Sequence, residues 1–415
     1  LENKTFIAIC DGIVGMEGNG PSHGEPRKAD LILASATAAG AGDVRVWAPA
    51  NGKTATVSIQ PGLAVGRGQT LYMGALVSGA RAVLGNNANA AWEGDVVVDT
   101  SVGTPSLWIG NNYTKSASPL SIGRADAPGT TRIESSGDIQ VRGNESLTIN
   151  FYSRFVSSRT YGTDVNRGIT FSNSGRCNFY GQGGSFKLMT FCQPAVCACA
   201  ENVFCDTVRL RLGYPGDNTL TSLDMNGFDQ RIGALEEIYV TQAYAGSSRT
   251  IYSVAPATLT ICGADETTWG SAFNMSAITG AVSVVRAGTG TTTFAGRNRY
   301  TGETVLESGA LVASVEGALA GTTNVVIKAG NLTIGHSKTL NRKAALTFAS
   351  GATGKVTLAA GVRAEARRGL FVGGVRLPSG TYGATGSGAE FIRDDLFAGE
   401  GCVAAGPFGV LLIVR

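Results

Sequence analysis

Short apolar segments that contain β-branched residues recur along the chain, and each ends in a glycine. Four of them read VSVVRAG, ETVLESG, NVVIKAG and LTFASG, and their glycines are Gly288, Gly309, Gly330 and Gly351, each 21 residues after the one before. A second short segment follows each glycine, as in TTTFAG, ALVAS, NLTIG and KVTLAAG. Apolar and polar positions that alternate over four to eight residues predict β-strands, because strand side chains point to opposite faces in turn.

The constant interval predicts a solenoid, in which each coil buries its apolar side against the next coil. Parallel coils about 4.8 Å apart pair every backbone group, and glycine supplies the positive φ that corners require. We therefore predict an all-β fold, a single-stranded right-handed parallel β-helix with rungs of about 21 residues. Val285, Leu306, Ile327 and Phe348 would then lie in one column. An antiparallel meander is the alternative, and a hairpin across Gly309 would establish it.

The upstream part of the chain has the same character but loses the constant interval. Its β-prone segments read DVRVWAP, ATVSIQPG, TLYMGA, AVLGNN, DVVVDTS, SLWIGNN, DIQVRGN and SLTINFYS. Insertions in the loops between coils explain the lost register. We expect three parts: a Gly-rich N-terminal segment at 1–36 that is not an independent domain, an irregular β-solenoid at 37–220, and a regular β-solenoid at 221–415.

Composition and charge exclude several classes. Of 415 residues, 43% are hydrophobic, which is enough for a core and excludes wholesale disorder. The net charge is +3, and Lys and Arg are scattered rather than clustered, with RKAD and EARRGL the densest basic spots. Neither spot is interleaved with aromatic residues, so we predict no nucleic-acid binding. No apolar run approaches the roughly 20 residues of a membrane span, and we predict that the final FGVLLIVR is a strand.

The regular part of the chain resembles a known repeat family. FAGRNRYTGETVLESGALVAS is similar to the autotransporter-associated β-strand repeat, through Gly296, Asn298, Tyr300, Thr301, Gly302, Thr304, Gly309, Leu311 and Ser314. LDMNGFDQRIGALEE resembles a second segment of the same proteins, and LFVGGVRLPSGTYGATGSGAEFIRDDLFAGEGCV resembles their closing cassette, which Cys402 and AAGP interrupt. The resemblance spans about 221–401. It implies a large secreted or surface-exposed bacterial β-helix, a stalk or passenger, and it implies no catalytic activity.

The N-terminal segment resembles a different family. DGIVGMEGNGPSHGEPRKADLILAS, residues 11–35, resembles the signature segment of an uncharacterised family associated with iron–sulfur ferredoxin modules. Cys10 is the only cysteine in this region, so the cluster ligands of that family are missing and we expect a remnant or a join without its activity. The glycines of this loop could expose backbone N–H groups to an anion beside Asp11 and Glu17, but a turn at the chain end is the favoured interpretation. Because the sequence begins at Leu1, we expect it to be a fragment or a processed piece.

Eight cysteines are present: Cys10, Cys177, Cys192, Cys197, Cys199, Cys205, Cys262 and Cys402. Four of them fall in CQPAVCACAENVFC, and four thiolates can enclose zinc or an iron–sulfur cluster. The segment lacks paired C-x-x-C knuckles, so we favour buried thiols, with Cys197 and Cys199 stacked inward on one face. Disulfides and a metal site are the alternatives.

Histidine and carboxylate residues give no catalytic set. His-dependent nucleophilic catalysis needs a histidine oriented by a carboxylate, whereas His23 lies in the N-terminal segment and His336 lies at a predicted surface turn. Asp224 and Asp229 are predicted to cap solenoid corners, and the pairs Glu236–Glu237 and Asp394–Asp395 are predicted to be solvated turns. We therefore assign no catalytic, cofactor-binding or metal-binding residue and expect no cofactor.

These observations predict a structural or adhesive stalk or passenger segment of a secreted or cell-surface bacterial protein, associated with the outer membrane and without catalysis. Its expected partners are host or environmental glycans or other cell-surface proteins. The alternative is a carbohydrate-active β-helix of the polysaccharide lyase or hydrolase type.

Overall fold

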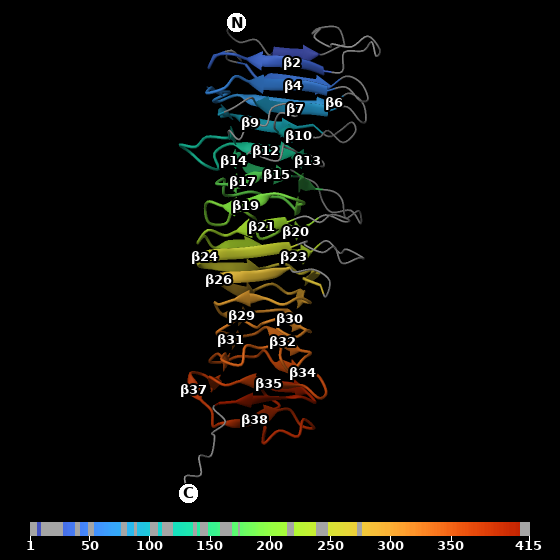
Figure 1. Ribbon diagram of the computed structural model, residues 1–415, viewed down its shortest axis with the longest axis vertical. Helices are drawn as coiled ribbons and strands as arrows, with labels where there is room; N and C mark the ends of the chain where they lie inside the picture. Colours follow the sequence, from blue (N-terminus) through green and yellow to red (C-terminus); the bar gives the residue numbers. More distant parts are fainter. Residues whose placement is uncertain are drawn as a thin grey trace. The chain divides into compact units, whose positions relative to one another are not determined.

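The computed structural model (Figure 1) divides into two compact units, Leu1–Val208 and Arg209–Arg415. It describes residues 6–9, 28–37, 42–48, 54–75, 81–86, 89–99, 107–109, 119–135, 139–141, 148–157, 168–172, 175–213, 220–237, 248–271 and 276–406. Four of the predicted features lie outside these ranges: Cys10, His23, the glycine loop of residues 11–20, and FGVLLIVR.

The first unit consists of parallel strands in four stacks, each strand paired with the equivalent strand of the next coil. The first stack contains β1 (Phe6–Ile9), β3 (Val44–Ala48), β6 (Thr70–Ala75), β9 (Asp95–Val98), β12 (Arg132–Ser135) and β15 (Arg154–Ser157). The second contains β2 (Lys28–Leu33), β4 (Thr54–Ile59), β7 (Arg81–Asn86) and β10 (Leu107–Ile109). The third contains β5 (Ala64–Val65), β8 (Ala90–Trp92), β11 (Leu120–Ile122), β14 (Thr148–Phe151), β17 (Arg176–Phe179) and β19 (Ala195–Ala198). The fourth contains β13 (Ile139–Val141), β16 (Ile169–Phe171) and β18 (Leu188–Phe191).

The second unit continues the same construction. One stack contains β21 (Leu220–Asp224), β22 (Gln230–Ile232), β24 (Ser248–Ile261), β26 (Ala277–Arg286), β28 (Arg299–Tyr300), β29 (Thr304–Leu306), β31 (Asn324–Ile327), β33 (Ala345–Phe348), β36 (Gly369–Val372) and β37 (Val375–Arg376). A second contains β25 (Glu266–Trp269), β27 (Thr291–Phe294), β30 (Ala310–Ala313), β32 (Asn331–Ile334), β34 (Val356–Leu358) and β40 (Phe397–Gly399). The pair β20 (Arg209–Leu212) and β23 (Ala234–Glu237) precedes them, and β35 (Arg363–Ala366), β38 (Gly380–Gly383), β39 (Phe391–Ile392) and β41 (Cys402–Ala405) close the unit.

The prediction of an all-β chain is confirmed, since no helix occurs among the described residues and the sheets are parallel, an arrangement compatible with a β-solenoid. Antiparallel pairing is found between β36 and β37 and between β38 and β41. Across Gly309 there is no hairpin: β29 pairs with β31 and β30 with β32, each in parallel, as Figure 1 shows by their order. The antiparallel meander is therefore excluded for this region.

The predicted column of apolar side chains is correct at three positions and wrong at the fourth. Leu306, Ile327 and Phe348 are paired in register on successive coils, and all three are fully buried. The residue that pairs with Leu306 on the preceding coil is Arg286, while Val285 pairs with Val305. That coil is one residue shorter, and a slip of one residue moves a strand side chain to the opposite face.

The four regularly spaced glycines are required for two different structural reasons. Gly309 and Gly351 have φ values of 65° and 71°, as expected for corners. Gly288 and Gly330 do not have positive φ. A side chain at Gly288 would collide with the backbone carbonyl of Cys262, and one at Gly330 would press against the backbone of the coil before it. The prediction of positive φ is therefore wrong for these two, which are glycines because successive coils approach too closely there.

Candidate functional site

Polar side chains of the 296–322 segment join successive coils in the interior. Asn298 is fully buried, and its Oδ1 accepts the N–H of Ile278 at 2.8 Å. Its Nδ2 donates to the carbonyl oxygen of Ala318 at 3.0 Å. Each partner is 20 residues away, one coil before and one coil after. A single amide thus holds three coils together.

Tyr300 heads a second buried chain of hydrogen bonds. Its hydroxyl lies 2.7 Å from Thr304 Oγ1, which donates to Thr322 Oγ1 at 3.1 Å. Thr322 Oγ1 in turn donates to the Gly302 carbonyl at 3.0 Å. Burial raises the pKa of Tyr300, so its phenol remains neutral. The side chains that carry the resemblance to the repeat family therefore bind the chain's own coils.

A groove of about 660 Å³ lies on the second unit, where charged and hydroxyl side chains of β23, β25 and β27 meet. It is lined by Glu236, Glu237, Glu266, Thr267, Thr268, Gly270, Ser271, Thr291 and Thr293. Glu266 pairs with Thr291 and Thr268 with Thr293 in the strand register, which places these four side chains on one face. Its volume falls in the range of small-molecule sites.

Arginine side chains neutralise one carboxylate of this groove. Glu236 Oε2 accepts hydrogen bonds from Arg209 Nη1 at 3.2 Å and from Arg211 Nη2 at 2.9 Å. Arg209 also donates to Asp265 Oδ2 at 2.8 Å. Glu236 is thereby held in place as the centre of an ion-pair network.

The neighbouring Glu237 is buried, which contradicts the prediction that Glu236–Glu237 forms a solvated turn. Both residues belong to β23, where alternation turns Glu237 toward the interior, on the same face as Leu235. Its Oε1 accepts a hydrogen bond from Nη1 of the fully buried Arg249 at 2.9 Å. The ion pair compensates the burial of both charges, which neither group would tolerate alone.

A second buried arginine lies without a carboxylate partner among the described residues. Arg286 donates from Nη1 to the Ile261 carbonyl at 2.8 Å and from Nη2 to the Gly263 carbonyl at 2.7 Å. Burial lowers the pKa of Arg286 because it penalises the charged form. Its role is to satisfy carbonyl oxygens at the corner of the preceding coil.

The consecutive glutamates of this groove do not face each other. Glu236 and Glu237 are consecutive on a strand and point to opposite faces, and arginines engage both of them. Glu266 is the exposed acid of the groove. Glycosidases use two carboxyl groups at a defined separation across the bond that breaks, and Glu236 and Glu237 do not form such a pair because they point to opposite faces of β23.

The aspartates behave largely as predicted. Asp224 Oδ1 caps the backbone N–H of Asn226 at 2.8 Å, and Asp229 Oδ1 accepts the N–H of Thr258, on the next coil, at 2.6 Å. Asp394–Asp395 is an exposed turn, in which Asp394 accepts both the backbone N–H and the hydroxyl of Thr385 at 2.7 Å. These two hydrogen bonds hold the pKa of Asp394 below its usual value.

His336 lies at a bend after β32. Its Nδ1 accepts the backbone N–H of Lys338 at 3.1 Å, and its carbonyl accepts the N–H of Thr339 at 3.1 Å. The imidazole is therefore part of the turn, where it was predicted to lie.

The cysteine segment is only partly as predicted. Cys197 and Cys199 do share a face, with their Sγ atoms 3.6 Å apart. It is not the inward face: Cys197 pairs with Asn178, whereas Val196 and Cys177 form the pair on the opposite side of the same strands. The inward-facing column therefore contains Val196 and not Cys197, because only every second side chain of a strand points inward. No disulfide joins any two of the seven cysteines that the structure describes.

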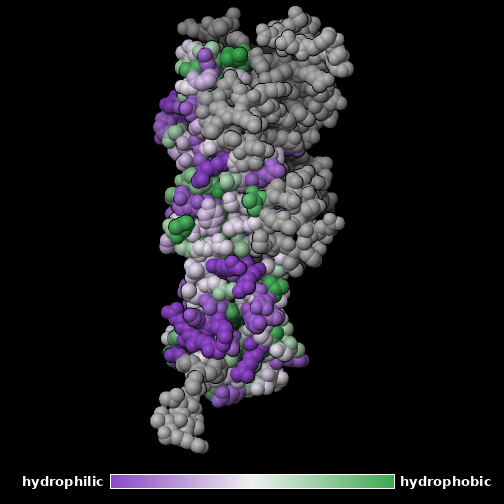
Figure 2. All heavy atoms as spheres, in the orientation of Figure 1, coloured by the Kyte–Doolittle hydropathy of each residue, from purple (hydrophilic) through white to green (hydrophobic). Residues whose placement is uncertain are grey.

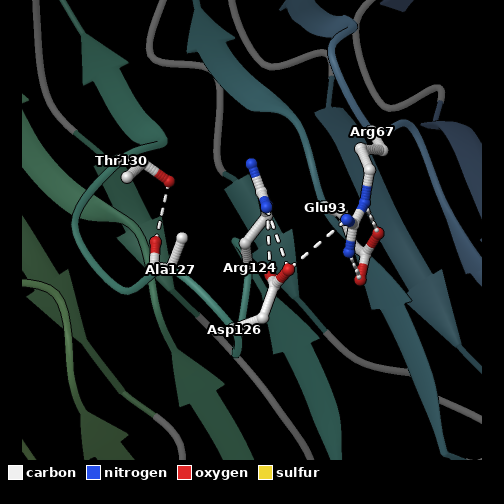
Figure 3. Close-up of polar contacts among 6 residues, drawn as sticks. All are labelled: Arg67, Glu93, Arg124, Asp126, Ala127 and Thr130. Atoms are coloured by element: carbon white, nitrogen blue, oxygen red, sulfur yellow. Dashed lines mark hydrogen bonds and ion pairs between the residues drawn. The ribbon is translucent and has the colours of Figure 1, made fainter.

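The first unit carries an exposed ladder of ion pairs, drawn in Figure 3. Arg67 Nε lies 2.8 Å from Glu93 Oε2, and Arg67 Nη1 lies 3.4 Å from Asp126 Oδ2, which Arg124 Nη2 approaches to 2.9 Å. These residues follow Val65, Trp92 and Ile122, which pair in register on three successive coils. The hydrogen bond from Arg124 lowers the pKa of Asp126. Charge complementarity on the surface therefore follows the same coil-to-coil order as the core.

Among the residues that the structure describes, no group of three or more His, Cys, Asp or Glu side chains is placed to hold a metal ion. These described residues also contain no helix that is long enough and apolar enough to cross a membrane. No family model matches the chain, and neither a curated protein nor a solved structure matches it.

Proposed function

We propose that the chain is a structural or adhesive segment of a secreted or cell-surface bacterial protein, a stalk or passenger without catalysis. It is built as a single-stranded right-handed parallel β-helix with rungs of about 21 residues, like the autotransporter-associated repeats that it resembles. Its partners are glycans or other surface proteins.

One observation carries the proposal: the polar side chains of the repeat are engaged between coils. Asn298 joins three coils, and Tyr300 and Thr304 begin a hydrogen-bond chain that reaches Thr322 on the next coil. Side chains used in this way give a repeat that stacks indefinitely, since each coil binds only its neighbours. This is the property that a stalk requires.

The hydrolytic alternative is weaker because the groove of Glu236, Glu237 and Glu266 ties two of its three carboxylates to arginine. The remaining hydroxyl groups of its threonines suit hydrogen bonding to a polar surface.

Fractionation of the bacterium that produces the chain tests the proposal. Antibodies against the second unit should detect it in the outer-membrane fraction or the culture medium, and protease added to intact cells should remove it. Recovery from the cytosol, with protection from external protease, would overturn the surface location. Release of sugar from a panel of polysaccharides by the purified chain would overturn the absence of catalysis.

A further inference from the structure

Basic side chains that lie far apart in the sequence meet in one groove of the second unit. The groove has a volume of about 540 Å³, and its cationic lining residues are Arg297, Lys338, Arg342, Lys343 and Arg363. Two carboxylates, Glu316 and Glu365, also line it. The prediction that Lys and Arg are scattered is therefore wrong here: Lys338, Arg342 and Lys343 lie within six residues of sequence, and stacking adds Arg297 and Arg363 from other coils. Figure 2 shows hydrophilic side chains gathered over the coils that contain β32, β34 and β35.

Backbone hydrogen bonds fix the spacing of the groove across successive coils. The N–H of Asn298 donates to the Gly317 carbonyl at 3.1 Å, and the N–H of Gly317 donates to the Lys338 carbonyl at 2.9 Å. On the following coil, the N–H of Arg363 donates to Ser337 Oγ at 2.9 Å. Four coils at about 4.8 Å each place the cationic groups along a line of roughly 14 Å.

Gly317 positions one of these cations. Its φ is 75°, and a Cβ at this residue would lie 2.8 Å from Arg297 Cγ and 3.0 Å from Arg297 Nε. The stem of Arg297 therefore lies directly on the Gly317 backbone, across the coil, and cannot do so above a residue with a side chain. This contact orients the guanidinium over the groove.

The carboxylates of the groove leave much of its positive charge uncompensated. Glu365 accepts hydrogen bonds from Arg342 and from Arg367, and although burial raises its pKa, these bonds outweigh that effect and keep the pKa below its usual value. Glu316 lies 3.8 Å from Lys338 across an exposed surface, a weak pairing. Within the described residues, no carboxylate forms an ion pair with Arg297 or Lys343.

The chemistry of the lining restricts the ligand. Among the described residues, no aromatic side chain lines the groove, so these residues offer no platform for stacked bases and none for the apolar face of a neutral sugar. Arginine and lysine bind sulfate and carboxylate oxygens through charge-assisted hydrogen bonds, which arginine can make in pairs. Cations on three of the four coils, separated by the coil of Gly317, match a chain that carries anionic groups at intervals along its length.

We propose that this groove binds a linear anionic polysaccharide, one that bears sulfate or carboxylate groups along its length. This proposal names a class of partner for the proposed adhesive role. It rests on that role only in taking the cell surface as the place where the protein meets its ligand. Arg297 and Lys343 supply the uncompensated charge, and Gly317 holds Arg297 in position.

Binding of heparin, which is a sulfated polysaccharide, to the purified full chain tests the proposal by calorimetry at two salt concentrations. The double variant R297Q/K343Q should raise the Kd about tenfold and lower the salt slope by about one to two. The matched control R299Q/K328Q removes the same charge from exposed residues that do not line the groove, and should change the Kd less than twofold. Amide hydrogen exchange of both variants should match that of the unaltered chain.

Three results would overturn the proposal. Equal weakening by the two double variants would mean that net charge alone attracts the polymer. Binding of neutral dextran as tight as that of heparin would remove the role of charge, and tighter binding of single-stranded oligonucleotide than of heparin would identify a nucleic-acid site instead. A chain that fails to bind heparin at low salt refutes this inference and leaves the fractionation test of the surface location unaffected.

Discussion

Replacement of Asn298 with alanine is the sharpest test of how the coils are held together. The substitution removes the acceptor for the Ile278 N–H and the donor to the Ala318 carbonyl, which lie 2.8 Å and 3.0 Å away in a fully buried setting. A buried polar group left without a partner costs about 1–3 kcal/mol. Two such groups predict that the free energy of opening falls by about 2–6 kcal/mol around this residue. N298D should be at least as damaging, since it keeps the acceptor but buries a charge.

Native-state amide hydrogen exchange read by mass spectrometry suits this measurement, because a repeat array opens locally and does not unfold as one unit. Peptides that cover β26, β29 and β31 should exchange at least about 30-fold faster in N298A, which corresponds to about 2 kcal/mol. The matched control is N331A, in which an exposed asparagine loses one hydrogen bond from the Lys355 N–H, at 2.9 Å. Its effect should stay within about 0.5 kcal/mol. Equal exchange in N298A and N331A would refute the role assigned to the buried amide.

Three further predictions concern the same unit. I327A should destabilise the column by about 2–5 kcal/mol, measured by the same exchange experiment, because this fully buried side chain packs between two others; a loss below 1 kcal/mol would contradict the column. G309A should speed local amide exchange more than G351A does, since both have positive φ but only Gly309 faces carbonyl oxygens of the preceding coil; the reverse order would contradict the close approach. The lowered pKa of Asp394 means that its contribution to stability is present above the unfolded pKa, near 4, and is lost as the pH falls through the lower folded value; limited proteolysis of the β38–β40 region between pH 6 and pH 3 should show this loss. D394N should reduce the dependence, and the part that remains should come from Asp395, whose pKa the hydrogen bond from Arg393 also lowers.

The strands and their order along each coil could be predicted from the sequence, because alternation and a constant interval are sequence-level consequences of stacking. Thr291–Phe294 and Ala310–Ala313, for example, were expected as paired segments and are found so. The slip at Arg286 could not be predicted, because the length of a corner depends on how closely the backbone approaches the coil before it. The shortening lies between Phe294 and Thr304, a connection two residues shorter than the equivalent one from Ala313 to Val325. The corner at Gly288, where the close approach leaves no room for a side chain, is one residue longer than the next and offsets half of that difference.

The buried charges were missed for a related reason. A pair such as Glu236–Glu237 suggests a solvated turn when only its neighbours in the chain are considered, since an unpaired buried carboxylate is prohibitive. The partner of Glu237, however, is Arg249, twelve residues further on and on another strand. The sequence did contain a signal. Glu237 lies two positions after Leu235 on the same strand, and side chains two positions apart on a strand point to the same face.

The alternation of side chains along each strand and the length of each coil also determine where the basic groove lined by Arg297 and Lys338 forms. In a stack of coils, residues that are one period apart become neighbours, so charge must be compared at intervals near 20 and not within a window of adjacent positions. Asn298, Gly317 and Lys338 are separated by 19 and 21 residues and are joined by backbone hydrogen bonds. Arg297, beside the first, therefore lines the same groove as Lys338, two coils further on, although the intervening sequence contains no basic cluster. The charge of such a surface follows from the register, and a change of one residue in a corner would disperse it.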